Sequence, residues 1–412
     1  MAHRLLLCVL PASILFPAAP CRADASTGRA LRVRSDFPGG SGEVVRIDQA
    51  ERLVRIRPAR HPGKGWTCWW YVELAGIEPG QTVTVEVEGG VWAWPERASF
   101  SLDNRTWQHT AKARRLPGPD GKKTVALAYC QKVAADRAWF AWGPPYLPEH
   151  ARALIARAER ACPGAKGFEL CRTREGRPVP ALRVRPPVPK GAAGRGVWVQ
   201  ARQHAWESGS SWVCEGFAEW LVSDDPAAAA LRAAAEVHVV PIMDVDNVVR
   251  GAGGKGQEPR DHNRDWCAEP HWPSVAAATA RIRKLAAARR FDVFVDLHNP
   301  GAGDREPFFY VPPADEMAPT QRDNLKQFLT DVRAAMTGPF AFRGLTRVSG
   351  RNYDKNYKRI SKNWVTDHTG AHVVAVTLET AWNTPHSTPS HYCRVGRDLG
   401  RGIARFLLRT TP

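Results

Sequence analysis

The sequence predicts an α/β domain, with a mixed, mostly parallel sheet and helices on both faces, preceded by an all-β sandwich domain. The first observation is a change of pattern along the 412-residue chain. Short strand-like runs with frequent turns come first, and strands then alternate with helices. The second observation is that later strands such as Phe291–Leu297 and His372–Leu378 are almost continuously apolar. Such strands are typical of a sheet that is covered on both faces.

Residues 26–143 carry the pattern of the sandwich. Thr82–Glu88 alternates strictly between polar and apolar residues, and Val54–Arg57 does so over a shorter run. Thr124–Cys130 and Ala138–Trp142 predict further strands, and clusters of proline and glycine separate these runs. Several short strands with frequent turns favour a β-sandwich.

The second domain is predicted to cover residues 144–412, because Gly143-Pro144-Pro145 interrupts the strand pattern. Its expected elements alternate between helices and buried strands. In chain order they are a helix at Pro148–Ala161, a strand at Val197–Ala201, a helix at Ser211–Val222, a strand at Glu236–Met243, a helix at Ser274–Arg289, a strand at Phe291–Leu297, a helix at Thr320–Met336, a strand at His372–Leu378 and a helix at Val395–Leu408.

The first 25 residues predict a secretory signal peptide. Arg4 supplies its positive charge, Leu5–Phe16 its apolar stretch and Ala23-Asp24-Ala25 its cleavage site. We therefore expect an exported protein, periplasmic or extracellular, without a membrane span. Cys21 leaves a lipoprotein anchor as an alternative.

Composition narrows the possible partners. The net charge of +17 is compatible with nucleic acid, an anionic envelope or acidic substrates, but an arginine-rich proteome is the simpler explanation and is favoured over them. No basic block with interleaved aromatic residues is present, so we expect no nucleic-acid partner. None of these patterns indicates an oligomeric state. Among the nine cysteines, Cys162 and Cys171 are close enough in sequence to close a small disulfide loop, and the lack of a CxxC motif argues against a thiolate zinc site.

Three of the buried strands lead to polar side chains. The strand at 197–201 leads to His204 and Glu207, the strand at 291–297 to His298, and the strand at 372–378 to Glu379. Contact with water at the sheet edge is enough to explain any one polar residue at a strand end. Three such strands on one sheet point more strongly to a functional site. Two imidazoles and one carboxylate are the ligands of a catalytic zinc site with an open position. Glu379 would then be the general base.

Five motifs follow one another along the second domain. In this order they resemble the HPGE, NPDG, NR-x-W, DLH and TLE pattern of the zinc carboxypeptidases, specifically the branch that contains the cytosolic carboxypeptidases and their bacterial relatives. The resemblance covers roughly residues 146–412, and that branch also carries a β-sandwich before its catalytic domain. It implies the zinc carboxypeptidase fold. The motifs here are HAWE (His204–Glu207), DVDN (Asp244–Asn247), NRDW (Asn263–Trp266), DLH (Asp296–His298) and TLE (Thr377–Glu379).

The resemblance implies one Zn²⁺ per chain and a role for each matching residue. The zinc ligands would be His204, Glu207 and His298, and Glu379 would be the general base and acid. By the same resemblance, Asn263 and Arg264 would hold the terminal carboxylate of the substrate. Tyr357, at the family's usual spacing before the glutamate, would contact the substrate, with the nearby Tyr353 as a second candidate.

The chain departs from the family pattern at three places. Ala205 and Trp206 replace the proline and glycine of HPGE, and DVDN replaces NPDG. The third departure is in the glycine-rich loop, where the family arginine that stabilises the oxyanion has no direct counterpart. We expect Arg250 to serve instead, with Lys255 as the alternative.

These observations predict a zinc-dependent carboxypeptidase that removes C-terminal residues from peptides or proteins. Lys362 lies in the basic stretch before Glu379 and would favour an acidic terminal residue if it points into the pocket. One alternative is a zinc amidase or peptidase that acts on cell-wall peptides. Another is a catalytically impaired, zinc-containing binding protein whose sandwich carries the function.

Overall fold

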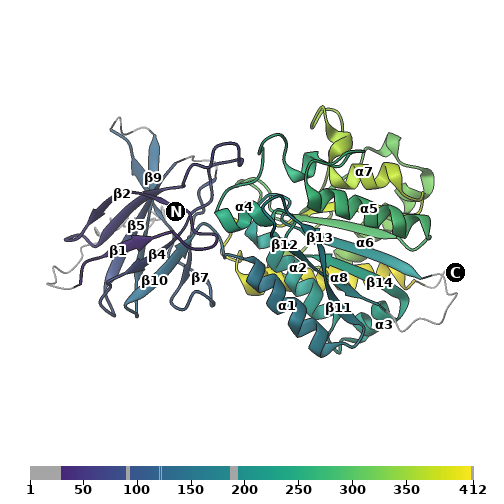
Figure 1. Ribbon diagram of the computed structural model, residues 1–412, viewed down its shortest axis with the longest axis horizontal. Coiled ribbons are helices and arrows are strands. Elements are labelled where there is room, and N and C mark those ends of the chain that lie inside the picture. Colours follow the sequence, from purple (N-terminus) through teal and green to yellow (C-terminus); the bar gives the residue numbers. More distant parts are fainter. Residues whose placement is uncertain (1–28, 90–92, 120, 122, 186–193, 410–412) are drawn as a thin grey trace, which may run out of the picture.

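Strands alone form one lobe of the protein, and a sheet covered by helices forms the other (Figure 1). The computed structural model describes residues 29–89, 93–119, 121, 123–185 and 194–409. The expected signal peptide, residues 1–25, lies outside the described residues. Within the described ranges, no helix combines the length and the apolarity that crossing a membrane requires.

Two five-stranded sheets make up the N-terminal lobe. All of its strand pairs are antiparallel except the pair formed by β3 and β5. The first sheet runs in the order β1 (Arg32–Arg34), β4 (Tyr71–Ala75), β10 (Arg137–Ala141), β6 (Ser99–Ser101) and β7 (Gln108–His109). The second runs in the order β2 (Glu43–Asp48), β3 (Leu53–Arg57), β5 (Thr82–Glu88), β9 (Thr124–Lys132) and β8 (Arg114–Pro117).

The alternation in Thr82–Glu88 produces the expected inward-facing row. Val83, Val85 and Val87 are fully buried in the core between the two sheets. The polar residues between them are buried as well, because β5 is the middle strand of its sheet and neighbouring side chains cover its outer face. Glu86, for example, forms an ion pair with Arg55 at 2.6 Å.

The second lobe is built on an eight-stranded mixed sheet. Its four central strands are parallel, and antiparallel strands flank them. This confirms the predicted fold class. The order is β11 (Ala165–Arg172), β12 (Pro178–Val184), β14 (Ala235–Val240), β13 (Arg195–Ala201), β15 (Val293–His298), β18 (Val374–Glu379), β16 (Phe308–Val311) and β17 (Thr346–Val348).

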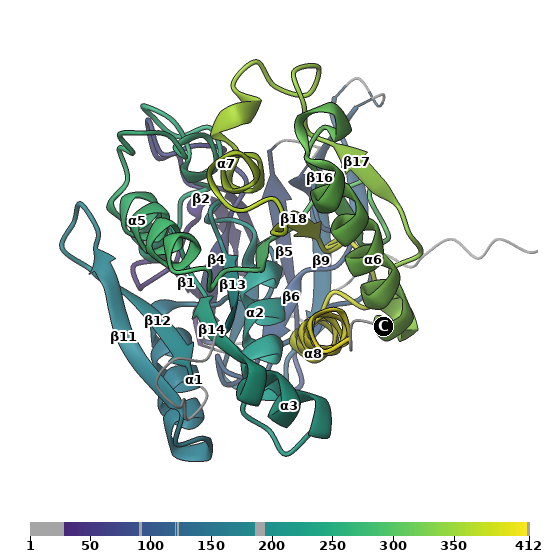
Figure 2. The same ribbon diagram turned by 90° about the vertical axis from the view of Figure 1, so that its right-hand side faces the viewer.

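Helices cover both faces of this sheet (Figure 2). The layer that contains α2 and α8 lies on one face, and α5 and α7 lie on the other. The apolar side chains of the central strands are therefore fully buried on both sides. The helices are α1 (Pro148–Ala161), α2 (Ser208–Leu221), α3 (Pro226–Ala234), α4 (Val245–Arg250), α5 (Pro273–Ala287), α6 (Pro319–Ala335), α7 (Ser361–His368) and α8 (Pro389–Leu407).

Cys162 and Cys171 do not form the expected disulfide bond in the structure. Cys162 caps the end of α1, Cys171 lies in β11, and both pack as free thiols against the core. The seven cysteines within the described residues are all free thiols.

A group of tryptophans joins the two lobes. Trp142 follows the last strand of the sandwich, and its ring lies 5.0 Å from Trp206 and 4.2 Å from Trp382, both of the second lobe. Trp206 and Trp382 belong to the hydrophobic core of the sandwich, although they lie far away in sequence. The lobes are therefore packed together through a shared apolar cluster.

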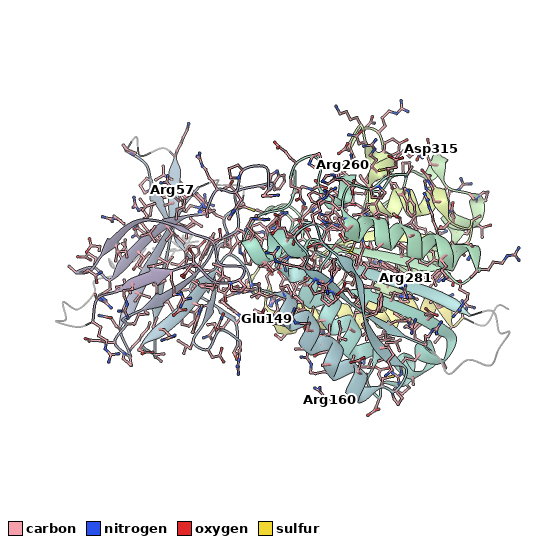
Figure 3. The ribbon with its side chains drawn as sticks, in the orientation of Figure 1. Arg57, Glu149, Arg160, Arg260, Arg281 and Asp315 are labelled. Atoms are coloured by element: carbon pink, nitrogen blue, oxygen red, sulfur yellow. The ribbon has the colours of Figure 1, made fainter. Side chains whose placement is uncertain are left out.

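Basic side chains are spread over the surfaces of both lobes. Figure 3 labels Arg57 on the sandwich and Arg160 at the end of α1, and both point outward from the ribbon.

Candidate active site

A cavity of about 440 Å³ opens at the carboxyl ends of the central strands. Ligands of open α/β sheets bind at this edge. The cavity contains seven of the nine residues that the sequence singled out, and leaves out Arg250 and Tyr357. The seven are His204, Glu207, Asn263, Arg264, His298, Lys362 and Glu379.

A tight turn after β13 presents His204 and Glu207. Arg202 adopts a positive φ of 65°, and its buried guanidinium donates to the carbonyl oxygens of Ala205 and Tyr146. The buried guanidinium of Arg202 therefore holds the turn in place through these hydrogen bonds. Glu207 is the N-cap residue of α2, so its position is fixed by the start of a helix.

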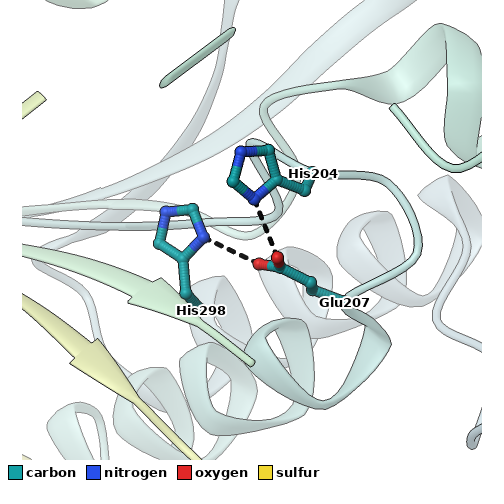
Figure 4. Close-up of side chains that lie close together, drawn as sticks. All are labelled: His204, Glu207 and His298. Atoms are coloured by element: carbon teal, nitrogen blue, oxygen red, sulfur yellow. Dashed lines mark hydrogen bonds and ion pairs between the residues drawn. The ribbon is translucent and has the colours of Figure 1, made fainter. Parts of the chain in front are cut away.

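The three predicted ligands converge on one point (Figure 4). Glu207 lies between the two histidines, with one carboxylate oxygen 2.8 Å from Nδ1 of His204 and the other 2.7 Å from Nδ1 of His298. All three side chains are buried, and their ligand atoms lie within 4.8 Å of one another.

The far nitrogens of both imidazoles also face carboxylates. Nε2 of His298 lies 3.0 Å from Asp296, and Nε2 of His204 lies 3.6 Å from Asp261. Carboxylates in this position orient a metal-binding histidine and make it a stronger ligand. Asp296 is itself held by Ser361, whose hydroxyl donates to it at 2.6 Å.

The donor set fits Zn²⁺. Two imidazole nitrogens and one carboxylate oxygen, facing an open cavity, are the protein ligands of catalytic zinc sites. The charges agree with a cation at this point. Burial alone would raise the pKa of Glu207, but His204 and His298 lower it below its usual value. Burial alone would lower the pKa of His298, but Asp296 and Glu207 raise it well above its usual value.

Glu379 lies beside this group at the end of β18. The carboxylate is buried, and its Oε2 atom has no hydrogen-bond partner among the described residues. Burial raises the pKa of Glu379 to about 8, against the opposing charge of His298. An unsatisfied carboxylate with a raised pKa in a cavity is suited to accepting and returning a proton.

Arg264 is fixed in the wall of the cavity by its neighbours. Its Nε donates to Asp354 at 2.6 Å, and its Nη1 donates to the carbonyl oxygen of Asn263 at 2.9 Å. The side-chain oxygen of Asn263 accepts from the backbone of Ser361, and its amide nitrogen lies 3.3 Å from Nε2 of His298. Both residues are therefore held before any ligand arrives.

The structure does not bring Arg250 to the cavity, so the expectation that it stabilises the oxyanion there is corrected. Arg250 is the last residue of α4, and its guanidinium bonds Glu175 and Asn247 on the wall of a separate, smaller cavity. The glycine-rich loop instead presents Lys255, the alternative considered from sequence, to the catalytic cavity.

Tyr357 is also directed away from the cavity. Its hydroxyl bonds Glu316, while Tyr353 lines the cavity next to Arg264. Lys362 is fully buried in the cavity wall and donates to Ser349. Burial lowers the pKa of Lys362 to about 7.

Asp261 and Trp66 are among the residues of this site that were missed in the sequence. Asp261 supports His204, but a single aspartate before the NRDW motif carries no recognisable signal. Trp66 lines the cavity from the N-terminal lobe. Its position depends on how the lobes dock, which no local pattern reveals.

Comparisons with known proteins show which family and fold this chain is similar to. Residues 152–283 match the family model described as zinc carboxypeptidase. An uncharacterized protein from Zymomonas mobilis is 28% identical over 58% of this chain and 60% of its own length. Cytosolic carboxypeptidase 2 from Danio rerio is 30% identical over 63% of this chain and 39% of its own length. The chain thus spans less than two thirds of these curated relatives.

Solved structures share the fold of the whole described chain. A metallo-carboxypeptidase from Burkholderia cenocepacia matches with a TM-score of 0.77 and 22% identity. The match covers 92% of this chain and 99% of that protein. The arrangement of a strand-rich N-terminal lobe and a helix-covered mixed sheet is therefore also found in that protein.

Proposed function

We propose that this chain, which carries a zinc carboxypeptidase domain, is a metallocarboxypeptidase that removes single residues from the C-termini of peptides or proteins. The observation that carries the proposal is the content of one cavity. A His₂Glu ligand set, an unsatisfied buried glutamate and three cationic side chains all line the same space.

His204, Glu207 and His298 would hold the Zn²⁺ ion. When bound, it supplies Lewis-acid polarisation of the scissile carbonyl. Glu379 takes a proton from the attacking water and returns it to the amine that leaves. Its raised pKa supports both steps, since the group changes its protonation state near neutral pH.

Arg264 binds the terminal carboxylate of the substrate in this proposal. A guanidinium forms paired, charge-assisted hydrogen bonds with a carboxylate, and Asp354 already holds it in place. Lys255 lies in the same cavity and supplies a positive charge for the oxyanion that develops on the scissile carbonyl.

We also propose a preference for an acidic terminal residue. Lys362 lines the cavity, whereas the neighbouring Lys358 points away and pairs with Glu316 and Asp367. No carboxylate of the described chain forms an ion pair with Lys362. An acidic side chain of the substrate would provide the missing counter-charge.

Export remains part of the proposal. It rests on the charged start, the apolar stretch and the small-residue site within residues 1–25. N-terminal sequencing of the protein recovered from a bacterial host tests it. A mature chain that starts after Ala25 is expected, and a chain that keeps Met1 would contradict export by this route.

The test of the function is hydrolysis of an N-terminally blocked peptide panel by the zinc-loaded protein. The panel varies the C-terminal residue and includes matched C-terminal amides. Release of single residues from free carboxylates, but not from amides, is expected. Cleavage of amides alone would favour the amidase, and zinc binding without any cleavage would favour a binding protein.

A further inference from the structure

Trp66 belongs to the N-terminal lobe but lines the catalytic cavity of the other lobe. It follows the turn 61–65, which projects from the sandwich toward the glycine-rich loop. With 40% of its surface exposed, it is one of the few large hydrophobic side chains that stay open to solvent within the described residues.

Backbone contacts fix Trp66 against the glycine-rich loop. The Trp66 N–H donates to the carbonyl oxygen of Lys255 at 2.9 Å, and the Gly254 N–H donates to that of Lys64 at 2.9 Å. The approach is so close that a Cβ on Gly253 would lie 2.0 Å from the Trp66 carbonyl oxygen. The indole is therefore held in place by the other lobe.

The side chain completes one wall of the cavity. The Trp66 ring stacks near Trp206 at 6.3 Å, and the ammonium group of Lys255 lies 5.3 Å from its centroid. Trp206 and Trp382 are almost entirely buried at 3% and 6% exposure. Of these three tryptophans, only Trp66 offers substantial area to a ligand.

The cavity lining combines polar and aromatic side chains. The polar group of Arg264, Lys362 and Ser349 suits the terminal residue in the proposed reaction. The aromatic group is formed by the three tryptophans, and Trp206 lies in the turn that presents His204 and Glu207. With the last residue of the substrate at the polar group, the tryptophans are left to contact the residues before it.

We infer that Trp66 selects the residue immediately before the scissile bond, favouring an aromatic side chain there. This inference rests on the proposed function, because that function sets the direction of the substrate. Aromatic side chains gain from edge or offset contact in addition to burial of their surface. The N-terminal lobe thereby becomes part of the specificity site.

The test is equilibrium binding of two N-terminally blocked peptides that both end in glutamate. One has phenylalanine before the last residue, and the other has alanine. The zinc-loaded Glu379→Gln protein is used, so that the peptides stay intact while fluorescence anisotropy gives the dissociation constants. We expect the phenylalanine peptide to bind about tenfold more tightly, equivalent to about 1.4 kcal/mol.

Substitutions distinguish direct contact from a structural role. Trp66→Ala is expected to reduce the preference to about twofold or less, and Trp66→Phe to keep most of it. Trp139→Ala, a half-buried tryptophan of β10 outside the cavity, should leave the preference unchanged. Equal weakening of both peptides by Trp66→Ala would overturn the inference, because the ratio would not depend on the indole.

Turnover of the same peptides by the wild-type protein separates this inference from the proposed function. A Trp66-dependent preference in binding without any hydrolysis would support the inference on Trp66 and overturn the proposed reaction. Hydrolysis without a Trp66-dependent preference would overturn only the role of Trp66. Failure of both peptides to bind would overturn both.

Discussion

His298 and Glu379 are register partners at the ends of the adjacent parallel strands β15 and β18. One is a predicted zinc ligand and the other the predicted base. Their backbone positions are set by the strand pairing, in the middle of the sheet. The distance between the ligand group and the base is therefore set by the pairing of two interior strands of the sheet.

Glu379→Gln should abolish most turnover. Glutamine keeps the shape of the side chain but cannot take a proton, so we expect kcat to fall by about 10³-fold. Zinc content, measured by mass spectrometry, should stay the same. Glu215→Gln is the matched control, because Glu215 is also buried and its pKa is also raised by burial, but it pairs with Arg157 outside the cavity. A large loss of turnover in Glu215→Gln, or none in Glu379→Gln, would refute the assignment of the base.

Glu207→Ala and His298→Ala should bind little or no zinc. Each removes one of three ligands and leaves a buried imidazole or carboxylate without its partner. Wild-type protein dialysed against a chelator should lose activity and regain it with zinc. His368→Ala, a histidine on α7 that stacks on Trp364 away from the cavity, serves as the control. Full zinc occupancy in Glu207→Ala would contradict the ligand set.

Lys255→Met should lower kcat by about 100-fold if its charge stabilises the oxyanion. Arg250→Met should change kcat by less than about threefold, because Arg250 is bound to Glu175 on the wall of another cavity. Steady-state kinetics with one readily cleaved peptide decide whether Lys255 or Arg250 stabilises the oxyanion. The opposite order of effects would restore the role that the sequence suggested for Arg250.

Lys362→Met should impair cleavage of acidic C-terminal residues selectively. Loss of a charge-assisted contact predicts a fall in kcat/KM of about 30-fold for a terminal glutamate. For a terminal leucine the expected change is about threefold or less. Equal losses on both peptides would mean that Lys362 has only a structural role.

Lys362 should also make stability depend on pH. Its pKa is lowered from 10.5 in the unfolded chain to about 7 in the folded protein, so between these values the unfolded chain binds more protons. The free energy of unfolding should therefore rise as the pH rises from about 7 toward 10.5, and the cost of burying the lysine is fully present below pH 7.

Urea unfolding at about pH 7 and pH 9.5 measures this effect. The difference in stability between Lys362→Met and wild type should favour the variant more at pH 7 than at pH 9.5. Lys284→Met removes an exposed lysine of α5 and should show the same difference at both pH values. A difference that does not change with pH for Lys362→Met would refute the titration of this side chain.

The sequence predicted the regular parts of the fold well, because their patterns are local. The helix expected at Pro148–Ala161 has those bounds, and the strand of Thr82–Glu88 does too. The strands β11, β12, β16 and β17 were not predicted. They lie toward the edges of the sheet, and β11, β12 and β17 lack a continuous apolar run, while β16 is apolar but only four residues long.

In the candidate site, too, the residues that could be predicted are those with a local sequence pattern. His298 and Glu379 end buried strands, and His204 and Glu207 lie in the turn after another, so their meeting could be anticipated from sequence alone. Arg250 was misplaced because it ends helix α4, before the glycine-rich loop whose course decides which cation reaches the cavity, and that course depends on tertiary contacts. Two of these, the backbone bonds to Lys64 and Trp66, come from the other lobe.

Trp206 makes the two lobes depend on each other for packing, which has a consequence for their evolution. It stands in the four-residue motif that presents His204 and Glu207, yet its side chain completes the apolar core of the sandwich. Genetic exchange that replaced the sandwich alone would remove the packing around a residue flanked by two predicted ligands. The two domains are therefore not independent modules, and they are expected to be inherited, transplanted or truncated only as a pair.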